Sequence, residues 1–304
     1  MTSRSSNLAI PANEPATSKL AVFAADIKIT HTIFAMPFAL LSTFLAANGW
    51  PKMGQVVLIV FCMICARTVA MAMNRLLDAP LDALNPRTAR RAIPGGALSR
   101  GFFIAAVVIC SVAFVVATSG FWFWYHNVWP ITLSVPVLAF LSAYPLLKRF
   151  TRLCHYYLGA ALALAPVCAW VAIRGGIAWP PLVMAAAVLL WTAGFDIIYA
   201  CQDYQSDVET GVVSVPVALG ITRALWLARL THVGSAAMLL LLGHIVPQFG
   251  ALYHIGAGLA IALLVVEHVL VKPHDLSKVG LAFFTINGII SVILGTLGIL
   301  DVFC

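Results

Sequence analysis

The chain has 304 residues, of which 62% are hydrophobic and only 10% are charged, and its mean hydropathy is +0.98. Soluble domains contain about 45–50% apolar residues, so this composition excludes an ordinary soluble protein and indicates a membrane protein. The net charge of +7 would suit nucleic acid or acidic lipid. An excess of Lys and Arg in the cytoplasmic loops explains it more simply, and we expect no nucleic-acid partner.

The first 28 residues differ from the rest of the chain because they are polar and contain Arg4, Lys19 and Lys28. They lack the short apolar core and small-residue cleavage site that mark a signal peptide. We therefore expect a disordered cytoplasmic tail over residues 1–28 and a single transmembrane domain over residues 29–304.

Apolar runs of about 20 residues recur along that domain, and each is long enough for one helix to cross a bilayer. Glycine and proline separate several of them, as at Gly49 and Pro51 and at Pro180 and Pro181. We expect an all-α membrane protein with nine spans. The expected spans cover residues 29–48, 55–74, 101–119, 129–147, 154–173, 182–200, 223–246, 250–271 and 279–301.

The distribution of basic residues predicts the orientation of these spans. Fourteen of the eighteen Lys and Arg lie in the tail or in the connections after spans two, four, six and eight. The positive-inside rule therefore places the N-terminus and these connections in the cytoplasm. An odd number of spans places Cys304 on the opposite side.

A first acidic ladder, Asn74, Asp78 and Asp82, follows the second span within NRLLDAPLDALNPRTARR. If the helix continues past the membrane surface, residues at i, i+4 and i+8 lie roughly on one face. Carboxylates four residues apart repel each other and cost a helix a few tenths of a kcal/mol. The spacing therefore indicates a cation between them.

A second acidic ladder, Asp196, Asp203 and Asp207, follows the sixth span within FDIIYACQDYQSDVE, at i, i+7 and i+11. Acidic residues do not set orientation, so the positive-inside rule does not explain this cluster. Two ladders of hard oxygen ligands at one membrane face predict a Mg²⁺ site, which would be shared with a phosphate.

Basic residues near the ladders are suited to bind the phosphate oxygens at the same site. Arg87, Arg90 and Arg91 follow the first ladder, and Lys148 and Arg149 end the fourth span in YPLLKRFT. Guanidinium groups and Mg²⁺ together are suited to hold a diphosphate. The alternative is a set of loop charges in surface ion pairs, which does not account for two ladders at matching helix ends.

Arg67 lies inside the second span, seven residues before Asn74 and therefore on the same helix face. An arginine within a membrane helix is costly and by default marks a functional site. We therefore expect Arg67 to contribute to the same site.

Three motifs in this order resemble the UbiA superfamily of intramembrane aromatic prenyltransferases. NRLLDAPLDALNPRTARRAIPGG resembles its first aspartate motif, YPLLKRFT its tyrosine-proline-lysine-arginine motif, and DYQSDVETGVVSVPVALG its second aspartate motif. The form NRLxDxxxDxxNPRT, preceded by HTIFAMPFAL, resembles a bacterial branch of UbiA-like 4-hydroxybenzoate polyprenyltransferases. The resemblance extends from residue 25 to the end of the chain.

The resemblance implies a nine-helix bundle around a central cavity, with a polar cytoplasmic cap, in a bacterial inner membrane. It implies transfer of a polyprenyl group from polyprenyl diphosphate to an aromatic acid in quinone biosynthesis, with two Mg²⁺ ions bridging the diphosphate. The implied acceptor is 4-hydroxybenzoate, or a dihydroxynaphthoate of the futalosine route to menaquinone. The bilayer gives the prenyl tail lateral access.

The resemblance also assigns roles to individual residues. Arg67, Asp196 and Tyr199 are the implied catalytic residues. The implied metal ligands are Asn74, Asp78, Asp82, Asp203 and Asp207. The implied contacts to the diphosphate or to the acid group of the acceptor are Asn74, Arg67, Arg75, Arg87, Arg91, Lys148 and Arg149.

Arg75 departs from the pattern, because many members of the superfamily carry aspartate after the motif asparagine. Arg75 is expected either to touch the diphosphate or to face solvent. Lys28 and His31 lie one turn apart at the entrance of the first span. They are expected either to bind the carboxylate of the acceptor or to anchor the helix at the membrane surface.

Two alternative functions are compatible with the sequence. One is a superfamily member that acts on another acceptor, such as a haem or a chlorin. The other is a transporter, which would carry ionisable groups near the membrane midplane and broken helices in matched halves. The charges here concentrate at one face, apart from Arg67, and this favours the enzyme.

Overall fold

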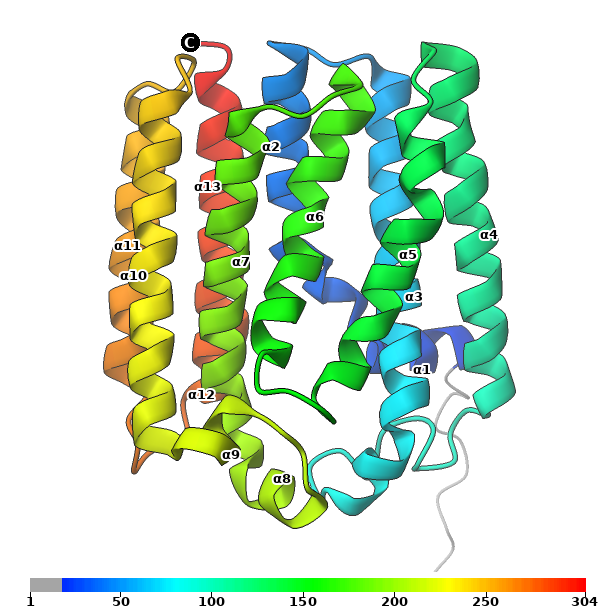
Figure 1. Cartoon of the computed structure of the whole chain (residues 1–304), viewed down its shortest axis with the longest axis vertical. Helices are drawn as coiled ribbons and strands as arrows, with labels where there is room; N and C mark the ends of the chain where they lie inside the picture. The colour runs from blue at the N-terminus through cyan, green and yellow to red at the C-terminus, as the bar shows by residue number, and fades with distance from the viewer. Residues whose placement is uncertain (1–17) are drawn as a thin grey trace, which may run out of the picture.

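The structure is a computed structural model that describes residues 18–304, apart from the side chains of Thr30 and His31. Figure 1 shows a bundle of long helices that run side by side, with connections at both ends. Eight helices of the described part are long and apolar enough to cross a membrane. They are α3 Met53–Leu84, α4 Arg100–Tyr125, α5 Trp129–Leu147, α6 Cys154–Arg174, α7 Trp179–Ala200, α10 Ile221–Ile245, α11 Ala251–Leu270, and a last helix, Val279–Asp301, built from α12 Val279–Leu281, η3 Ala282–Ile286 and α13 Asn287–Asp301.

The first expected span, 29–48, is not one long helix, so the expected count of nine is not reached. It consists of a 3₁₀ helix, η1 Ile29–Phe34, and the 12-residue helix α2 Met36–Ala47. Pro37 lies in the first turn of α2, where its missing N–H and fixed φ favour the start of a helix. The other eight expected spans each coincide with one of the long helices.

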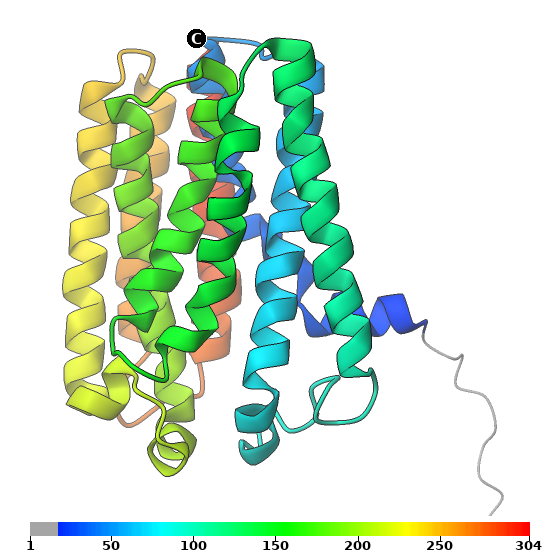
Figure 2. The same cartoon turned by 45° about the vertical axis from the view of Figure 1, so that its right-hand side comes forward.

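The predicted tail extends too far, because its last part forms the helix α1 Lys19–Asp26. Ser18 caps this helix by accepting a hydrogen bond from the Ala21 N–H at 3.2 Å. Phe23 is buried and packs edge-on against Phe102 and Phe103 of α4. Figure 2 shows α1 lying across the bundle direction and projecting to one side. The remaining part of the predicted tail, residues 1–17, lies outside the described residues.

The bundle carries a cap at one end, because α3 continues beyond the membrane. Its 32 residues extend roughly 48 Å, compared with about 30 Å for the hydrocarbon core of a bilayer. The loop 85–99 follows α3, and η2 Cys201–Asp203, α8 Tyr204–Thr210 and α9 Val215–Leu219 follow α7 at the same end. The ends of both acidic ladders therefore meet in this cap.

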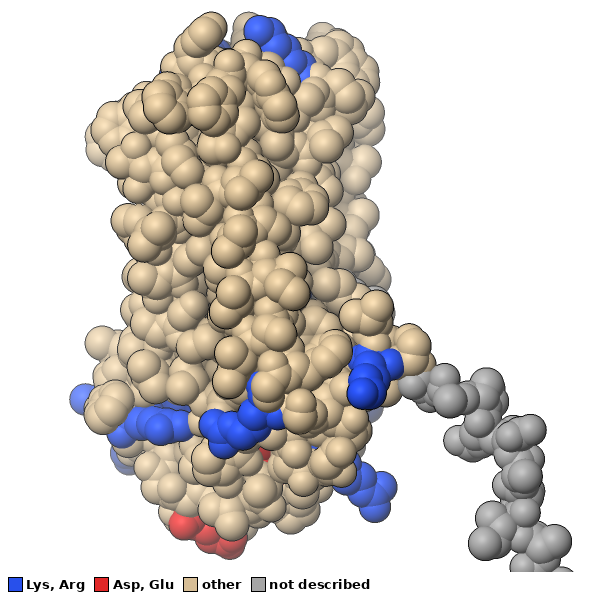
Figure 3. All heavy atoms as spheres, turned by 90° about the vertical axis from the view of Figure 1, so that its right-hand side faces the viewer, with Lys and Arg blue, Asp and Glu red and all other residues tan. Residues whose placement is uncertain are grey.

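The surface of the described helices agrees with a membrane-spanning bundle. Figure 3 shows Lys and Arg gathered at two levels, separated by a broad band without charge, and acidic side chains beyond the lower level. Large apolar side chains such as Ile109, Val116, Leu230 and Val265 are exposed. An apolar outer face is what lipid chains require.

Helices α6 and α7 pack so closely that Gly159 has no room for a side chain. A Cβ at this position would overlap the Leu189 backbone oxygen. We expect Gly159→Ala to lower the free energy of unfolding by about 1–3 kcal/mol, because rigid backbone would have to move. The measurement is the thermal unfolding midpoint in detergent. Gly258→Ala is the control, since a Cβ there meets nothing within 4 Å, and an equal loss in both variants would contradict the prediction.

Candidate active site

A polar pocket of about 210 Å³ lies between the cap and the adjacent ends of α3, α5, α6 and α7. It brings together ten residues that the sequence singled out from three separate segments. These residues are Asn74, Asp78, Asp82, Arg87, Arg91, Lys148, Asp196, Tyr199, Asp203 and Asp207.

Asp78 is the most buried acid of the first ladder, with 2% of its surface exposed. Its Oδ2 lies 2.6 Å from Lys148 Nζ and accepts a hydrogen bond from Asn74 Nδ2, also at 2.6 Å. Its Oδ1 is buried and has no hydrogen-bond partner among the residues that the structure describes. Leaving a buried carboxylate oxygen unpaired is costly, so Oδ1 is an available ligand position.

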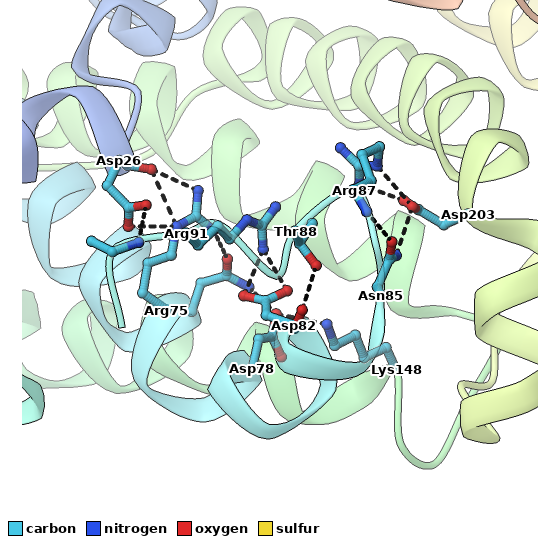
Figure 4. Close-up of polar contacts among 12 residues, drawn as sticks. Asp26, Arg75, Asp78, Asp82, Asn85, Arg87, Thr88, Arg91, Lys148 and Asp203 are labelled. Atoms are coloured by element: carbon cyan, nitrogen blue, oxygen red, sulfur yellow. Dashed lines mark hydrogen bonds and ion pairs between the residues drawn. The ribbon is translucent and has the colours of Figure 1, made fainter. Parts of the chain in front are cut away.

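Asp82, one turn further along α3, is held by the loop that follows the helix. Both of its carboxylate oxygens accept from Arg91 Nη1, at 2.7 and 2.8 Å. Thr88 Oγ1 donates to the Asp82 backbone oxygen at 3.1 Å. These contacts hold the loop 85–99 against the first ladder (Figure 4).

Arg87 links the two ladders across the pocket. Its Nε and Nη2 donate to the two oxygens of Asp203 at 2.8 and 2.6 Å, and its Nη1 donates to Tyr199 Oη at 2.8 Å. Asn85 Nδ2 donates to the same Asp203 carboxylate at 2.9 Å. Burial alone would lower the pKa of Arg87, but the hydrogen bonds and charge of Asp203, together with Tyr199, outweigh it and raise that pKa. Forked pairs of this kind are strong, so Arg87 stays charged (Figure 4).

The donor set of this pocket fits Mg²⁺. Within residues 18–304 no three or more His, Cys, Asp or Glu side chains are grouped so that they could hold a metal ion by themselves. Mg²⁺ does not require such a group, because it commonly binds one or two carboxylates together with waters and substrate phosphate. The unpartnered Asp78 Oδ1 and the carboxylates of Asp82, Asp203 and Asp207 provide such ligands on both sides of the pocket.

Arg67 lies in a second, mainly apolar cavity of about 170 Å³, lined by α3, α4, α5 and α6. Its Nη2 donates to the Lys28 backbone oxygen at 3.3 Å, whereas its buried Nε has no partner within the described part of the chain. Tyr144 and Leu158 line both cavities, so the apolar cavity adjoins the polar pocket. Lys28 Nζ lies over the ring of Tyr199, 6.0 Å from its centroid.

The structure does not bring every candidate residue to the pocket. Arg149 is exposed and donates to the Leu77 backbone oxygen of α3. Arg75 is buried and does not line the pocket, although it contacts the pocket residue Asn74. The side chain of His31 lies outside the described residues.

His155 was missed by the sequence reasoning. Its Nδ1 lies 2.7 Å from Asp196 Oδ2, and its Nε2 accepts a hydrogen bond from the Val215 N–H at 3.2 Å. Because Nε2 is an acceptor, Nδ1 carries the proton and donates to Asp196. The available signal was a histidine in the first turn of an apolar span, directly after the YPLLKRFT loop.

A bundle of helices long and apolar enough to cross a membrane, with paired acids and bases in a pocket at one end, is the architecture of an integral membrane protein with a polar pocket. The chain belongs to the UbiA prenyltransferase family, whose model matches residues 35–289. It is therefore a prenyltransferase of the UbiA type.

Two curated relatives are 4-hydroxybenzoate octaprenyltransferases. The protein of Methylococcus capsulatus is 30% identical over 251 residues, which are 81% of this chain and 82% of the relative. The protein of Pseudomonas fluorescens is 28% identical over 245 residues, which are 80% of each chain.

Solved structures share the fold. The apo structure of a UbiA homolog from Aeropyrum pernix K1 superposes with a TM-score of 0.80 at 29% identity, covering 90% of this chain and 98% of that chain. A UbiA homolog from Archaeoglobus fulgidus bound to GPP and Mg²⁺ superposes with a TM-score of 0.69, covering 93% of this chain and all of that chain. At 17% identity the second likeness shows the fold alone.

Proposed function

We propose that the protein transfers a polyprenyl group from polyprenyl diphosphate to the ring of 4-hydroxybenzoate, with Mg²⁺, in quinone biosynthesis. The observation that carries the proposal is that two acidic ladders face one pocket, which adjoins an apolar cavity containing an arginine. The names of the curated relatives support the acceptor, and the Mg²⁺ and GPP bound to the Archaeoglobus homolog support the donor.

The diphosphate would lie in the polar pocket. Asp78 and Asp82 on one side and Asp203 and Asp207 on the other would hold two Mg²⁺ ions, as the family resemblance implies. Bound there, Mg²⁺ would neutralise the negative charge that develops on the departing diphosphate. Lys148, Arg87 and Arg91 now pair with these acids, and they would turn to the phosphate oxygens.

The apolar cavity would hold the reacting end of the prenyl chain and the acceptor ring. Its mainly apolar lining would keep water away from an allylic cation after the carbon–oxygen bond breaks. Tyr144 lies at the junction of the two cavities, where its ring face can stabilise that cation.

The acceptor carboxylate would pair with Arg67, whose unpartnered Nε leaves a strong donor available. The activated ring carbon then attacks the cation, and the ring loses a proton. We assign the role of proton acceptor to Asp196, which lines the pocket and is oriented by His155. Asp196 would pass this proton to solvent through the open polar pocket.

A dihydroxynaphthoate is the second candidate acceptor. It also carries a carboxylate that would pair with Arg67, and the Asn74-Arg75 form of the first motif is shared with the branch for which it is implied. We propose that the cap faces the cytoplasm, which is supported by the basic residues gathered at that end.

The test of this function is an assay of membranes that contain the protein, supplied with Mg²⁺, polyprenyl diphosphates and a panel of aromatic acids. Prenylated 4-hydroxybenzoate as the sole product would support the proposal, and prenylated dihydroxynaphthoate would assign the second acceptor. If no combination of substrates yields a prenylated acid, both proposed acceptors are wrong.

Lys28 should make binding of the acceptor depend on pH. Burial, followed by the charges of Arg75, Arg91 and Arg87, lowers the pKa of Lys28 to about 8. Its ammonium is therefore charged below pH 8 and neutral above it. We expect the KM for 4-hydroxybenzoate to rise about fivefold as the pH rises through 8, because an attraction of about 1 kcal/mol is lost.

Steady-state kinetics over about one unit on either side of pH 8 measure this change. Lys28→Gln should show the high KM at every pH, and Lys28→Arg should keep the low KM throughout. If the KM of Lys28→Gln depends on pH in the same way as the KM of the wild type, a group other than Lys28 titrates.

A further inference from the structure

Arg75 sits in a closed set of polar contacts outside the pocket, with 3% of its side chain exposed. Its Nε lies 3.1 Å from Asp26 Oδ2, and its Nη2 donates to the Asp26 backbone oxygen at 2.8 Å. Its Nη1 donates to Asn74 Oδ1 at 2.8 Å. Arg75 is thus fully engaged by protein groups, and neither role expected for it, contact with diphosphate or with solvent, describes it.

Asp26 joins three parts of the chain. It is the last residue of α1, and its Oδ2 and backbone oxygen hold Arg75 of α3. Its Oδ1 accepts a hydrogen bond from the Ala92 N–H at 2.9 Å, in the loop that carries Arg91. Figure 4 shows Asp26 and Arg75 beside Arg91, at one side of the first ladder.

The contacts of Arg75 determine how the Asn74 amide is turned. A guanidinium has only donors, so the atom of Asn74 that faces it must be the oxygen. The Nδ2 group of Asn74 is then directed to Asp78, and donates to Asp78 Oδ2 at 2.6 Å. With Oδ2 engaged by this bond and by Lys148, Asp78 presents its unpartnered Oδ1.

We propose that Asp26 and Arg75 form a positioning clasp, through which α1 orients Asn74 and thereby holds Asp78 in its metal-binding position. The inference rests on the Mg²⁺ site of the proposed function. In this chain Asn74 acts on the site by holding Asp78, and its own oxygen is occupied by Arg75. The helix α1 lies outside the bundle core, but through this clasp it helps to position Asn74 and Asp78.

The clasp has a measurable consequence for metal affinity. Residues that orient a metal ligand typically change affinity by about 10- to 100-fold when they are removed. Arg75→Met keeps an apolar side chain of similar length but releases Asn74. We expect it to raise the Kd for Mn²⁺, used as a spectroscopic substitute for Mg²⁺, about tenfold.

Arg75→Met alone leaves the buried Asp26 carboxylate without its charged partner, which is expected to destabilise the fold. The double variant Asp26→Leu/Arg75→Met removes both charges, and such paired replacement is often neutral for stability. We expect the double variant to unfold near the wild-type temperature and to show the same tenfold increase in Kd.

The experiment titrates full-length protein in detergent with Mn²⁺, with and without inorganic pyrophosphate, and follows binding by electron paramagnetic resonance. Arg100→Gln is the matched control, because Arg100 also contacts α3, at the Leu76 backbone oxygen, but does not line the pocket. It should bind Mn²⁺ as the wild type does.

The outcomes separate the clasp from the proposed function. If the wild type binds Mn²⁺ and the folded double variant binds it equally well, the clasp is wrong and the metal site stands. If the wild type binds no Mn²⁺ either with or without pyrophosphate, the proposed metal site is wrong, and the proposed clasp is wrong as well. A tenfold loss of affinity in Arg100→Gln as well would show a general effect of disturbing the contacts of α3 and would also overturn the clasp.

Discussion

Asp78→Ala and Asp207→Ala should each reduce prenyl transfer by about a thousandfold or more. Each substitution removes a carboxylate from one side of the polar pocket, and in the proposed function the two sides bind the diphosphate together. Electrostatic stabilisation of developing charge commonly contributes more to catalysis than any other effect, and loss of one stabilising group costs about 10²–10³ in rate. Loss of a metal ligand removes more, because the charge of the ion is lost as well.

The measurement is the rate of formation of prenylated 4-hydroxybenzoate in membranes with matched amounts of each variant. Asp275→Ala is the control, because Asp275 lies in an exposed loop, where its carboxylate contacts Ser277. It should keep wild-type activity. Full activity in both Asp78→Ala and Asp207→Ala would show that the ladders do not hold the diphosphate.

The ladders could be found from the sequence because they depend on local geometry. Residues four apart share a helix face wherever the helix continues, and α3 does continue from Asn74 to Leu84. The regular connections between spans then bring the second ladder to the same end. In the structure both ladders line one pocket, and their role in binding metal and diphosphate stays a prediction.

The contacts between distant residues could not be predicted. Asp26 and Arg75 are separated by 49 positions, and His155 and Asp196 by 41. No periodic pattern relates such residues, and their pairing is set by the packing of whole helices. Asp26 also lies in a polar segment that composition alone assigns to a tail, because a short helix anchored by Phe23 leaves little trace in composition.

The bounds of the first span could not be predicted from composition for a similar reason. Composition extends the apolar run over residues 29–48, but proline at the start of α2 and the left-handed conformation of Lys28 interrupt the helix. The interruption brings Lys28 beside Tyr199 and its backbone oxygen to Arg67. The break therefore brings Lys28 close to a residue of each cavity, Tyr199 of the polar pocket and Arg67 of the apolar cavity.

Arg67→Gln should raise the KM for 4-hydroxybenzoate about 10- to 100-fold while it leaves the KM for polyprenyl diphosphate unchanged. A hydrogen bond to a charged group contributes about 1.5–3 kcal/mol, which corresponds to this range. Arg67 lines the apolar cavity and does not line the polar pocket, so its loss should affect the acceptor alone. Arg67→Lys should be intermediate, because an ammonium keeps the charge but cannot form the forked pair.

An acceptor without a carboxylate provides the decisive comparison. Phenol cannot pair with Arg67, so the wild type and Arg67→Gln should prenylate it at the same low rate. Loss of the guanidinium should not destabilise the fold, because among the described residues its Nε has no partner to lose and its hydrogen bond to the Lys28 backbone oxygen is long, at 3.3 Å. An increase in the KM for polyprenyl diphosphate would instead assign Arg67 to the leaving group, and the acceptor carboxylate would then have to pair with Lys28.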